Sequence, residues 1–142
     1  MKALVVLTFL LGVMTMIRFV PMEPMDSQRA RAIAVNYAAY RNAVYLHVFN
    51  GNKASGSIAA ASLNLPVGFA LLRSWQARID AGCLYVWGPA SSDEIEATRD
   101  LFWGSQAVGR ADGGKLEPGH GGTTPVPSFV PDGSLVSVVG ID

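Results

Sequence analysis

The sequence has few of the residues from which most active sites are built. It contains one cysteine, Cys83, and two histidines, His47 and His120, which lie far apart along the chain. A single thiol excludes an internal disulfide and a CxxC pair, and we interpret Cys83 as a buried, inert thiol. The two histidines lack the spacing of a metal-binding HExxH helix. Neither residue type therefore predicts a metal or catalytic site.

An excess of one charge is also lacking, because 11 Lys and Arg residues balance 11 Asp and Glu residues. A nucleic-acid-binding protein is expected to carry a basic face, so the composition does not support that class. The chain has no GxxxxGK[ST] phosphate loop and no G-x-S-x-G nucleophile elbow. We therefore expect a non-enzymatic protein with no cofactor, no metal, no nucleic-acid partner and no small-molecule substrate.

Apolar residues, in contrast, are abundant and are concentrated at the start of the chain, MKALVVLTFLLGVMTMIRFVP. As a helix with a rise of about 1.5 Å per residue, residues 3–22 would be about 30 Å long, which is enough to cross a bilayer. Pro21 and Pro24 would end that helix. The run ends in bulky residues without an A-x-A cleavage pattern, which favours an uncleaved membrane anchor at residues 1–22. A cleaved signal peptide and a soluble core helix are the alternatives.

The remaining residues, 23–142, have the length of one domain with one core. The short N-terminal tail favours an orientation in which this domain is exported. Arg18, Arg29 and Arg31 would then lie on the exported side, and this charge bias opposes the orientation that we prefer.

A long amphipathic helix is predicted at about residues 27–49. Its apolar residues recur at spacings of three and four: Ala30, Ile33, Ala34, Tyr37, Ala38, Val44 and Val48. Gly51 is suited to the left-handed position after the helix. Tyr37, Tyr40 and Tyr45 are interpreted as half-buried residues of the helix surface or, alternatively, as contacts to a partner.

The next segments predict a short Ala-rich helix within residues 55–69 and a β-hairpin at 71–88. A three-residue hairpin loop, Asp80-Ala81-Gly82, would place Trp75 opposite Trp87 and Ala77 opposite Tyr85. The clearest helix is SSDEIEATRDLFWG at 91–104. Ser91 and Glu94 form a capping box there, which explains the acidic cluster Asp93, Glu94 and Glu96 better than a catalytic carboxylate pair does. Ile95, Thr98, Leu101 and Phe102 of this helix can face the core.

The last third of the chain predicts a second hairpin, a long loop and a strand. Residues 105–117 turn at Asp112-Gly113-Gly114, and residues 134–141 read as a strand. Between them, residues 118–133 contain His120, Phe129 and several Gly and Pro residues, and are predicted to be a loop. These elements together predict an α+β domain that follows an N-terminal transmembrane helix, with an antiparallel sheet and helices packed on one face.

Five stretches of the sequence, taken together, resemble the PilM family of plasmid-borne type IVb (thin) pilus systems. They are NYAAYRNAVYLHV, LNLPVGF, WQARIDAGCLYVWG, LFWGSQAVGRADGGKL and TTPVPSFVPDGSLVS. The resemblance implies a non-enzymatic, single-pass inner-membrane protein of Gram-negative bacteria with its domain in the periplasm. Such a protein would act in pilin export or pilus assembly during conjugation. Its partners would be other inner-membrane and periplasmic pilus-assembly proteins, and pilin.

The resemblance implies no catalytic residues. It also does not say which residues contact a partner, so these are predicted from the aromatic residues and the histidine of three segments. We expect those contacts at the 27–49 helix, the tryptophan hairpin or the 118–133 loop, through Tyr37, Tyr40, Tyr45, Trp75, Trp87, His120 and Phe129. An alternative is a pilin-like minor subunit that enters the fibre. The opening stretch lacks the Gly-Phe and early Glu of a processed pilin leader, which argues against that alternative. A periplasmic hydrolase would need a nucleophile–base pair that the sequence does not show.

Overall fold

The structure, a computed structural model, describes residues 25–118 and 123–141. The predicted membrane anchor at residues 1–22 and the predicted contact residue His120 lie outside these ranges. Within the two described ranges, no helix is both long and apolar enough to cross a membrane. The described residues form a small α+β domain with two α-helices and a seven-stranded antiparallel sheet, which confirms the predicted fold class for this part of the chain.

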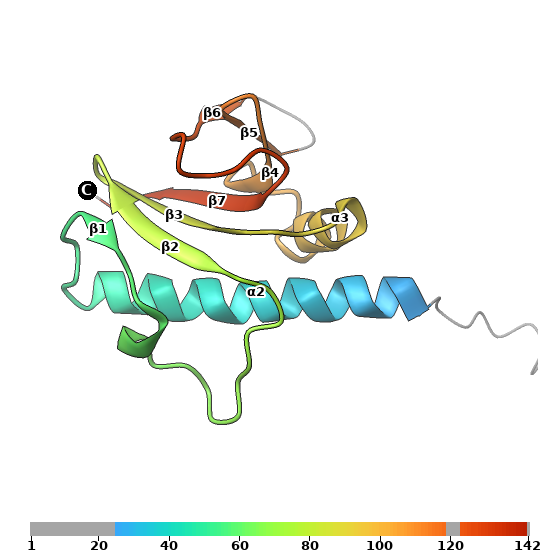
Figure 1. The fold of residues 1–142 in the computed structure, drawn as a ribbon, viewed down its shortest axis with the longest axis horizontal. Coiled ribbons are helices and arrows are strands. Elements are labelled where there is room, and N and C mark those ends of the chain that lie inside the picture. The colour runs from blue at the N-terminus through green and yellow to red at the C-terminus, as the bar shows by residue number, and fades with distance from the viewer. Residues whose placement is uncertain (1–24, 119–122, 142) are drawn as a thin grey trace, which may run out of the picture.

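The first described element is the long helix α2, Met25–Phe49, which confirms the predicted amphipathic helix. Its buried residues follow the predicted spacing and form one face: Ala30, Ile33, Ala34, Tyr37, Tyr40, Ala43, Val44 and Val48. The helix ends where Gly51 adopts a φ of 112°. Figure 1 shows that α2 runs along one side of the sheet and extends beyond it at its N-terminal end.

The sheet has the strand order β1-β2-β3-β7-β4-β5-β6, and every neighbouring pair is antiparallel. In chain order the elements after α2 are β1 (Gly56–Ser57), a 3₁₀ turn (Ala60–Ser62), β2 (Gln76–Asp80), β3 (Cys83–Gly88), α3 (Ser92–Leu101), β4 (Val108–Asp112), β5 (Lys115–Glu117), β6 (Thr124–Pro125) and β7 (Leu135–Gly140). The last strand, β7, lies in the centre, between β3 and β4 (Figure 1). It therefore joins the two hairpins into one sheet.

Both faces of the sheet are covered by apolar residues. On the helix face, Tyr37 and Val44 of α2 and Ile95 of α3 pack against Leu84 and Val86 of β3. Because successive residues of a strand point to opposite faces, the alternate positions of β3, Tyr85 and Trp87, belong to a second cluster. That cluster is completed by Ala111, Leu116, Val126, Val130 and Val136. The helices thus cover one face, and the returning chain before β7 covers part of the other.

The register of the first hairpin corrects the prediction. Asp80 pairs with Cys83, so the loop has two residues, Ala81 and Gly82, with φ values of 50° and 76°. Two positive φ values are the signature of a type I′ turn, whose twist matches that of the flanking strands. The shorter loop shifts the pairing by one residue and places Gln76, not Trp75, opposite Trp87. A shift of one residue turns a side chain to the other face, so the predicted tryptophan pair does not form.

Two further segments differ from their predictions. The predicted helix within 55–69 is reduced to the 3₁₀ turn at Ala60–Ser62, preceded by the short edge strand β1. The predicted loop at 118–133 includes the edge strand β6, and its apolar residues Val126, Phe129 and Val130 pack on the second cluster. The predicted hairpin at 105–117 is confirmed as β4 and β5, which turn at Gly113 and Gly114.

Candidate functional site

The helix α3 begins with the predicted capping box. The backbone N–H of Glu94 donates to Ser91 Oγ at 3.3 Å, and the backbone N–H of Ser91 donates to Glu94 Oε1 at 3.3 Å. These two bonds satisfy N–H groups that have no partner within the helix. The Glu94 carboxylate therefore has a structural role, and the preferred interpretation of the acidic cluster is confirmed.

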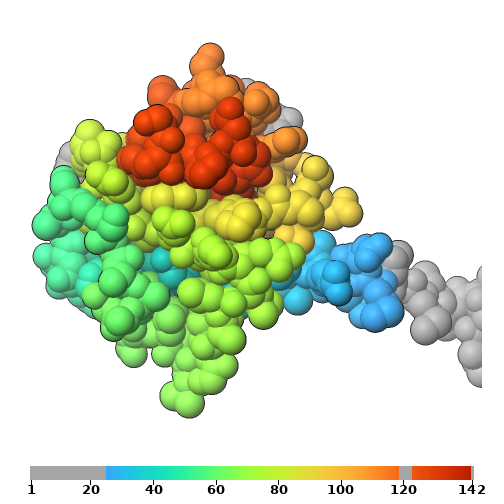
Figure 2. Space-filling view, viewed as in Figure 1, coloured from blue at the N-terminus to red at the C-terminus, as the bar shows by residue number. Residues whose placement is uncertain are grey.

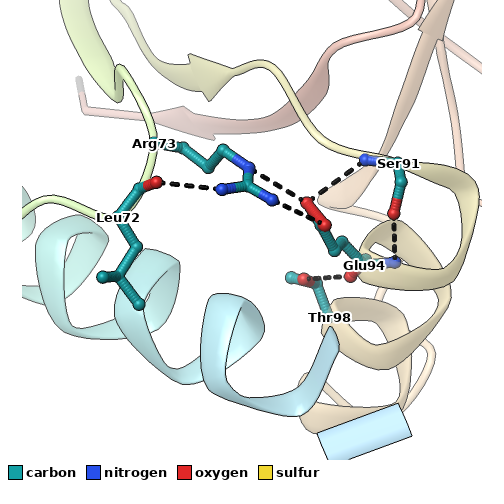
Figure 3. Close-up of polar contacts among 5 residues, drawn as sticks. All are labelled: Leu72, Arg73, Ser91, Glu94 and Thr98. Carbon is teal, nitrogen blue, oxygen red and sulfur yellow. Dashed lines mark hydrogen bonds and ion pairs between the residues drawn. The ribbon is translucent and has the colours of Figure 1, made fainter. Parts of the chain in front are cut away.

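Arg73, in the segment before β2, binds the same carboxylate. Its Nε donates to Glu94 Oε1 at 3.2 Å and its Nη2 donates to Glu94 Oε2 at 2.9 Å, as Figure 3 shows. A bidentate pair of this kind fixes direction as well as distance. Because Glu94 is only 5% exposed, this pair attaches the start of α3 firmly to the chain that leads into the sheet.

The environment of Glu94 makes the stability of the domain dependent on pH. Burial by itself raises the pKa of Glu94, but the hydrogen bonds from Arg73 and Ser91 and the charge of Arg73 outweigh it and hold the pKa below its usual 4.5. A lowered folded-state pKa gives stability that is present above the unfolded pKa and is lost as pH falls through the folded value. We expect the melting temperature to fall below about pH 4.5, and to fall less steeply in Glu94→Gln, in a series of melts from pH 7 to pH 3. An equal acid dependence in both proteins would contradict this role.

Asn36 of α2 attaches the segment before β2 from the other side. Its Nδ2 donates to the Ala70 carbonyl at 2.8 Å, and its Oδ1 accepts from the Leu72 N–H at 3.0 Å and from Trp75 Nε1 at 2.8 Å. One amide thus satisfies three polar groups of residues 70–75. Together, Asn36 and Glu94 hold this segment against α2 and α3, which fixes the two helices relative to each other.

The two helices leave an open groove of about 590 Å³ between them. From α2 it is lined by Asp26, Ser27, Ala30, Arg31, Ala34 and Val35, and from α3 by Asp93, Glu96, Ala97, Asp100 and Leu101. Three of these lining residues are alanines. Carboxylates predominate on the α3 side. Figure 2 shows that the N-terminal part of α2, which forms one wall, projects beyond the rest of the domain.

Large apolar side chains are exposed along the same helix pair. Val35 is 52% exposed and Leu101 is 41% exposed, which corrects the prediction that Leu101 faces the core. Two residues after Leu101, Trp103 is 95% exposed and adopts a φ of 59°. This position closes α3, because the Trp103 N–H donates to the Asp100 carbonyl and the Gly104 N–H donates to the Arg99 carbonyl. Glycine is the usual residue there, so a fully exposed tryptophan is unfavourable for the isolated domain.

The predicted contact residues are placed differently. Tyr37, Tyr40 and Trp75 are buried on the helix face, and the Tyr37 hydroxyl donates to the Val86 carbonyl at 2.7 Å. Burial raises the pKa of Tyr40 to about 12. Trp87 is buried in the second cluster. The structure assigns these four side chains to the core, where no partner can reach them, which corrects their prediction as surface contacts.

The other two predicted contacts that the structure describes are partly accessible. Tyr45 is half-buried and packs against Phe49, with ring centroids 4.3 Å apart. Phe129 is half-buried between Tyr85 and Trp87, and the guanidinium of Arg78 lies 4.8 Å from its ring centroid. The two lie on opposite faces of the sheet, so they do not form one surface.

The residues considered above for nucleophilic or metal chemistry, Cys83 and His47, lie on different elements. Cys83 is a free thiol at the start of β3, and it is half-buried rather than buried as predicted. His47 is half-buried near the C-terminal end of α2. In residues 25–118 and 123–141, no group of three or more His, Cys, Asp or Glu side chains could hold a metal ion.

Sequence reasoning missed the groove itself. The apolar periodicity of α2 marks one face of the helix, and the groove is lined by the stripe of residues beside that face. The sequence signal for the groove is that small and acidic residues recur at helical spacing in two segments, DSQRARAIAV and SDEIEATRDL. Only the packing of α2 against α3 makes the stripes of these two segments adjacent.

The elements define a small α+β domain in which two packed helices lie on one face of an antiparallel sheet and leave an open groove between them. The sequence model of the PilM family matches residues 6–138, and the chain therefore belongs to this family, which relates it to pilus biogenesis. A crystal structure of the protein PilM from Escherichia coli B7A shares the fold, with a TM-score of 0.61 and 19% sequence identity over 84% of this chain and 98% of that chain. No curated protein matches the chain.

Proposed function

We propose that this chain is a non-enzymatic component of the assembly apparatus of a type IVb, conjugative thin pilus. Residues 1–22 anchor it in the inner membrane, and residues 23–142 lie in the periplasm. There the domain binds other assembly proteins, pilin among them, and supports pilin export or pilus assembly. The observation that carries this proposal is the family match, which extends over residues 6–138 and so includes most of the apolar opening as well as the domain.

A binding role is supported by the contacts of the buried and half-buried ionisable residues, which hold elements of the domain together. The buried carboxylate, Glu94, is occupied by Arg73 and the cap of α3. Arg99 binds Glu96 and the Glu117 carbonyl, and so joins α3 to β5. These side chains hold elements together. The exposed apolar residues Val35, Leu101 and Trp103 are instead free to meet another protein.

A pilin-like minor subunit is the second candidate, and one observation favours it. A long helix, α2, follows the apolar opening and packs on an antiparallel sheet, which is the arrangement of a pilin (Figure 1). The two candidates differ in where the protein ends up: an assembly protein stays in the membrane, whereas a subunit enters the fibre.

The test uses a strain in which the gene is deleted and complemented with the full chain. We expect deletion to remove surface pili, and complementation to restore them, as counted by electron microscopy. The protein should stay in carbonate-washed membranes with residues 1–22 present in its intact mass, and should be absent from sheared fibres. Its recovery in the fibres would establish the pilin-like subunit. Normal piliation of the deletion strain would contradict both candidates, and a periplasmic product without residues 1–22 would identify a signal peptide.

A further inference from the structure

We propose that the groove between α2 and α3 binds an amphipathic helix of a second protein, and that this helix carries Lys or Arg on the flank that faces α3. The inference rests on the proposed role in pilus assembly and names the partner by its chemistry. Its basis is the geometry of the two walls, the charge of one wall, and the apolar residues exposed beside them.

The walls of the groove have the spacing that a third helix needs. From α2 the lining positions are 27, 30, 31, 34 and 35, with Asp26 beside the first of them, and from α3 they are 93, 96, 97, 100 and 101. Each set follows the pattern i, i+3, i+4, i+7, i+8, which is one continuous stripe on a helix about two turns long. Three of the lining residues are alanines, Ala30, Ala34 and Ala97, whose small side chains let the backbone of another helix approach closely. A groove of this kind is the site of helix-in-groove recognition.

The α3 wall is acidic. Asp93, Glu96 and Asp100 lie along it, and of these only Glu96 pairs with a cation, Arg99, within the part of the chain that the structure describes. Asp100 lies in the last turn of α3, where the helix already carries a negative partial charge. A carboxylate in that position is unfavourable for the free domain and becomes favourable when a cation is placed beside it. Charge complementarity therefore assigns the basic flank of the partner helix to the α3 side.

Apolar residues supply the other half of the recognition. Val35 and Leu101 lie at the same end of the two stripes, since Phe102, next to Leu101, contacts Tyr37 and Arg41 of α2, just beyond Val35. Trp103 lies two residues after Leu101, just beyond the end of the helix, and its ring is in solvent. Exposed aromatic residues are the usual anchors of a protein interface. The occupant is thus apolar towards the floor and basic on one side. The acidic wall would repel anionic phospholipid headgroups, so the observations favour a protein over a membrane surface.

The first test is a photocrosslink in cells that express the full chain. A benzoylphenylalanine at Val35 should crosslink to a second protein within a helical segment that carries Lys or Arg on one flank. The matched control is the same probe at Leu46, which lies on the same helix and is 54% exposed against 52% for Val35. Leu46 is outside the groove and should not capture that segment.

The second test exchanges charges across the interface. Asp100→Lys should reduce the Val35 crosslink by at least about tenfold, because two like charges then face each other. The fold should be retained, since a lysine suits the C-terminal end of a helix better than an aspartate does. Changing the facing Lys or Arg of the captured segment to Glu should restore the crosslink in Asp100→Lys. The matched control, Asp132→Lys, alters an exposed aspartate outside the groove and should leave the crosslink unchanged.

Several results would overturn the inference. The Val35 probe would contradict it by crosslinking no better than the Leu46 probe, or by capturing lipid, a second copy of this chain, this chain itself, or a segment without a basic helix. The charge exchange would contradict it if Asp100→Lys leaves the crosslink unreduced, or if the reversed charge on the captured segment does not restore it. The proposed function is tested separately by piliation. If the deletion strain loses its pili while the Asp100→Lys strain keeps them, the groove inference is wrong and the proposed function stands. If the deletion strain is normally piliated, the proposed function fails.

Discussion

Replacing Tyr37 with alanine is expected to lower the free energy of unfolding by about 3–5 kcal/mol, the range for truncation of a buried aromatic residue. Tyr37 is fully buried at the middle of α2. Its ring meets Trp75 edge to face with centroids 5.0 Å apart, and Phe102 with centroids 6.5 Å apart. The alanine variant removes the contacts of this ring with Trp75, which precedes β2, and with Phe102, at the end of α3. The melting temperature of the full chain in detergent, followed by near-UV circular dichroism, should fall by about 10 °C or more.

The control for this prediction is Tyr37→Phe, which keeps the ring and removes only the hydroxyl. The hydroxyl donates to the Val86 carbonyl at 2.7 Å, and its loss should cost about 1 kcal/mol. Comparable losses in the two variants would mean that the hydrogen bond, and not the packing of the ring, accounts for the effect. An unchanged melting temperature in Tyr37→Ala would show that α2 is not held on the sheet as described.

A methyl group at Gly109 is expected to be nearly as damaging. A Cβ at this position of β4 would lie 2.1 Å from the carbonyl oxygen of Glu117 and 2.8 Å from Pro118 Cα, which are backbone atoms that cannot rotate away. Gly109→Ala must therefore move β5 or the chain after it, and overpacking of this kind costs about 1–3 kcal/mol or more. We expect a lower melting temperature and faster hydrogen exchange at the amides of β5.

Gly140→Ala is the matched control, because it also adds one methyl group to a strand of the same sheet. A Cβ there would meet no atom within 4 Å. Its effect on the free energy of unfolding should be within about 0.5 kcal/mol. If both alanine variants are equally stable, the close approach of β4 to Glu117 is not present in solution.

The turns of the sheet show where sequence reasoning succeeds and where it fails. The second hairpin turns within the predicted Asp112-Gly113-Gly114, although Asp112 itself pairs with Lys115 and the turn consists of the two glycines, which accept positive φ values without cost. The first hairpin has only one glycine, Gly82, and sequence reasoning placed Asp80 in the loop beside it. The structure instead gives Ala81 the left-handed conformation, since the two-residue turn lets Ile79 pair with Leu84 on the helix face. Core burial on both strands outweighs the small cost of one alanine at positive φ.

The tyrosines of α2 illustrate a second limit. The spacing of the apolar residues showed which face of α2 is covered, and the structure confirms that face. It did not show how deep each residue lies. Depth depends on which strands the helix crosses, and β7 lies at the centre of the sheet because residues 126–134 return the chain from β6 to a place between β3 and β4. No local pattern records that return.

By itself, the sequence determined the long amphipathic helix, the capping box of α3, the second hairpin, the antiparallel α+β class and the resemblance to the PilM family. The first four follow from periodicity, capping chemistry and turn residues, which act over a few neighbouring positions, whereas the resemblance rests on the stretches of sequence that carry it. The tertiary structure alone decided the register of the tryptophan hairpin, the central place of β7, the burial of Tyr37, Tyr40, Trp75 and Trp87, and the groove between α2 and α3. Each of these depends on contacts between residues far apart in the chain, whose free energies add up only when the elements pack together.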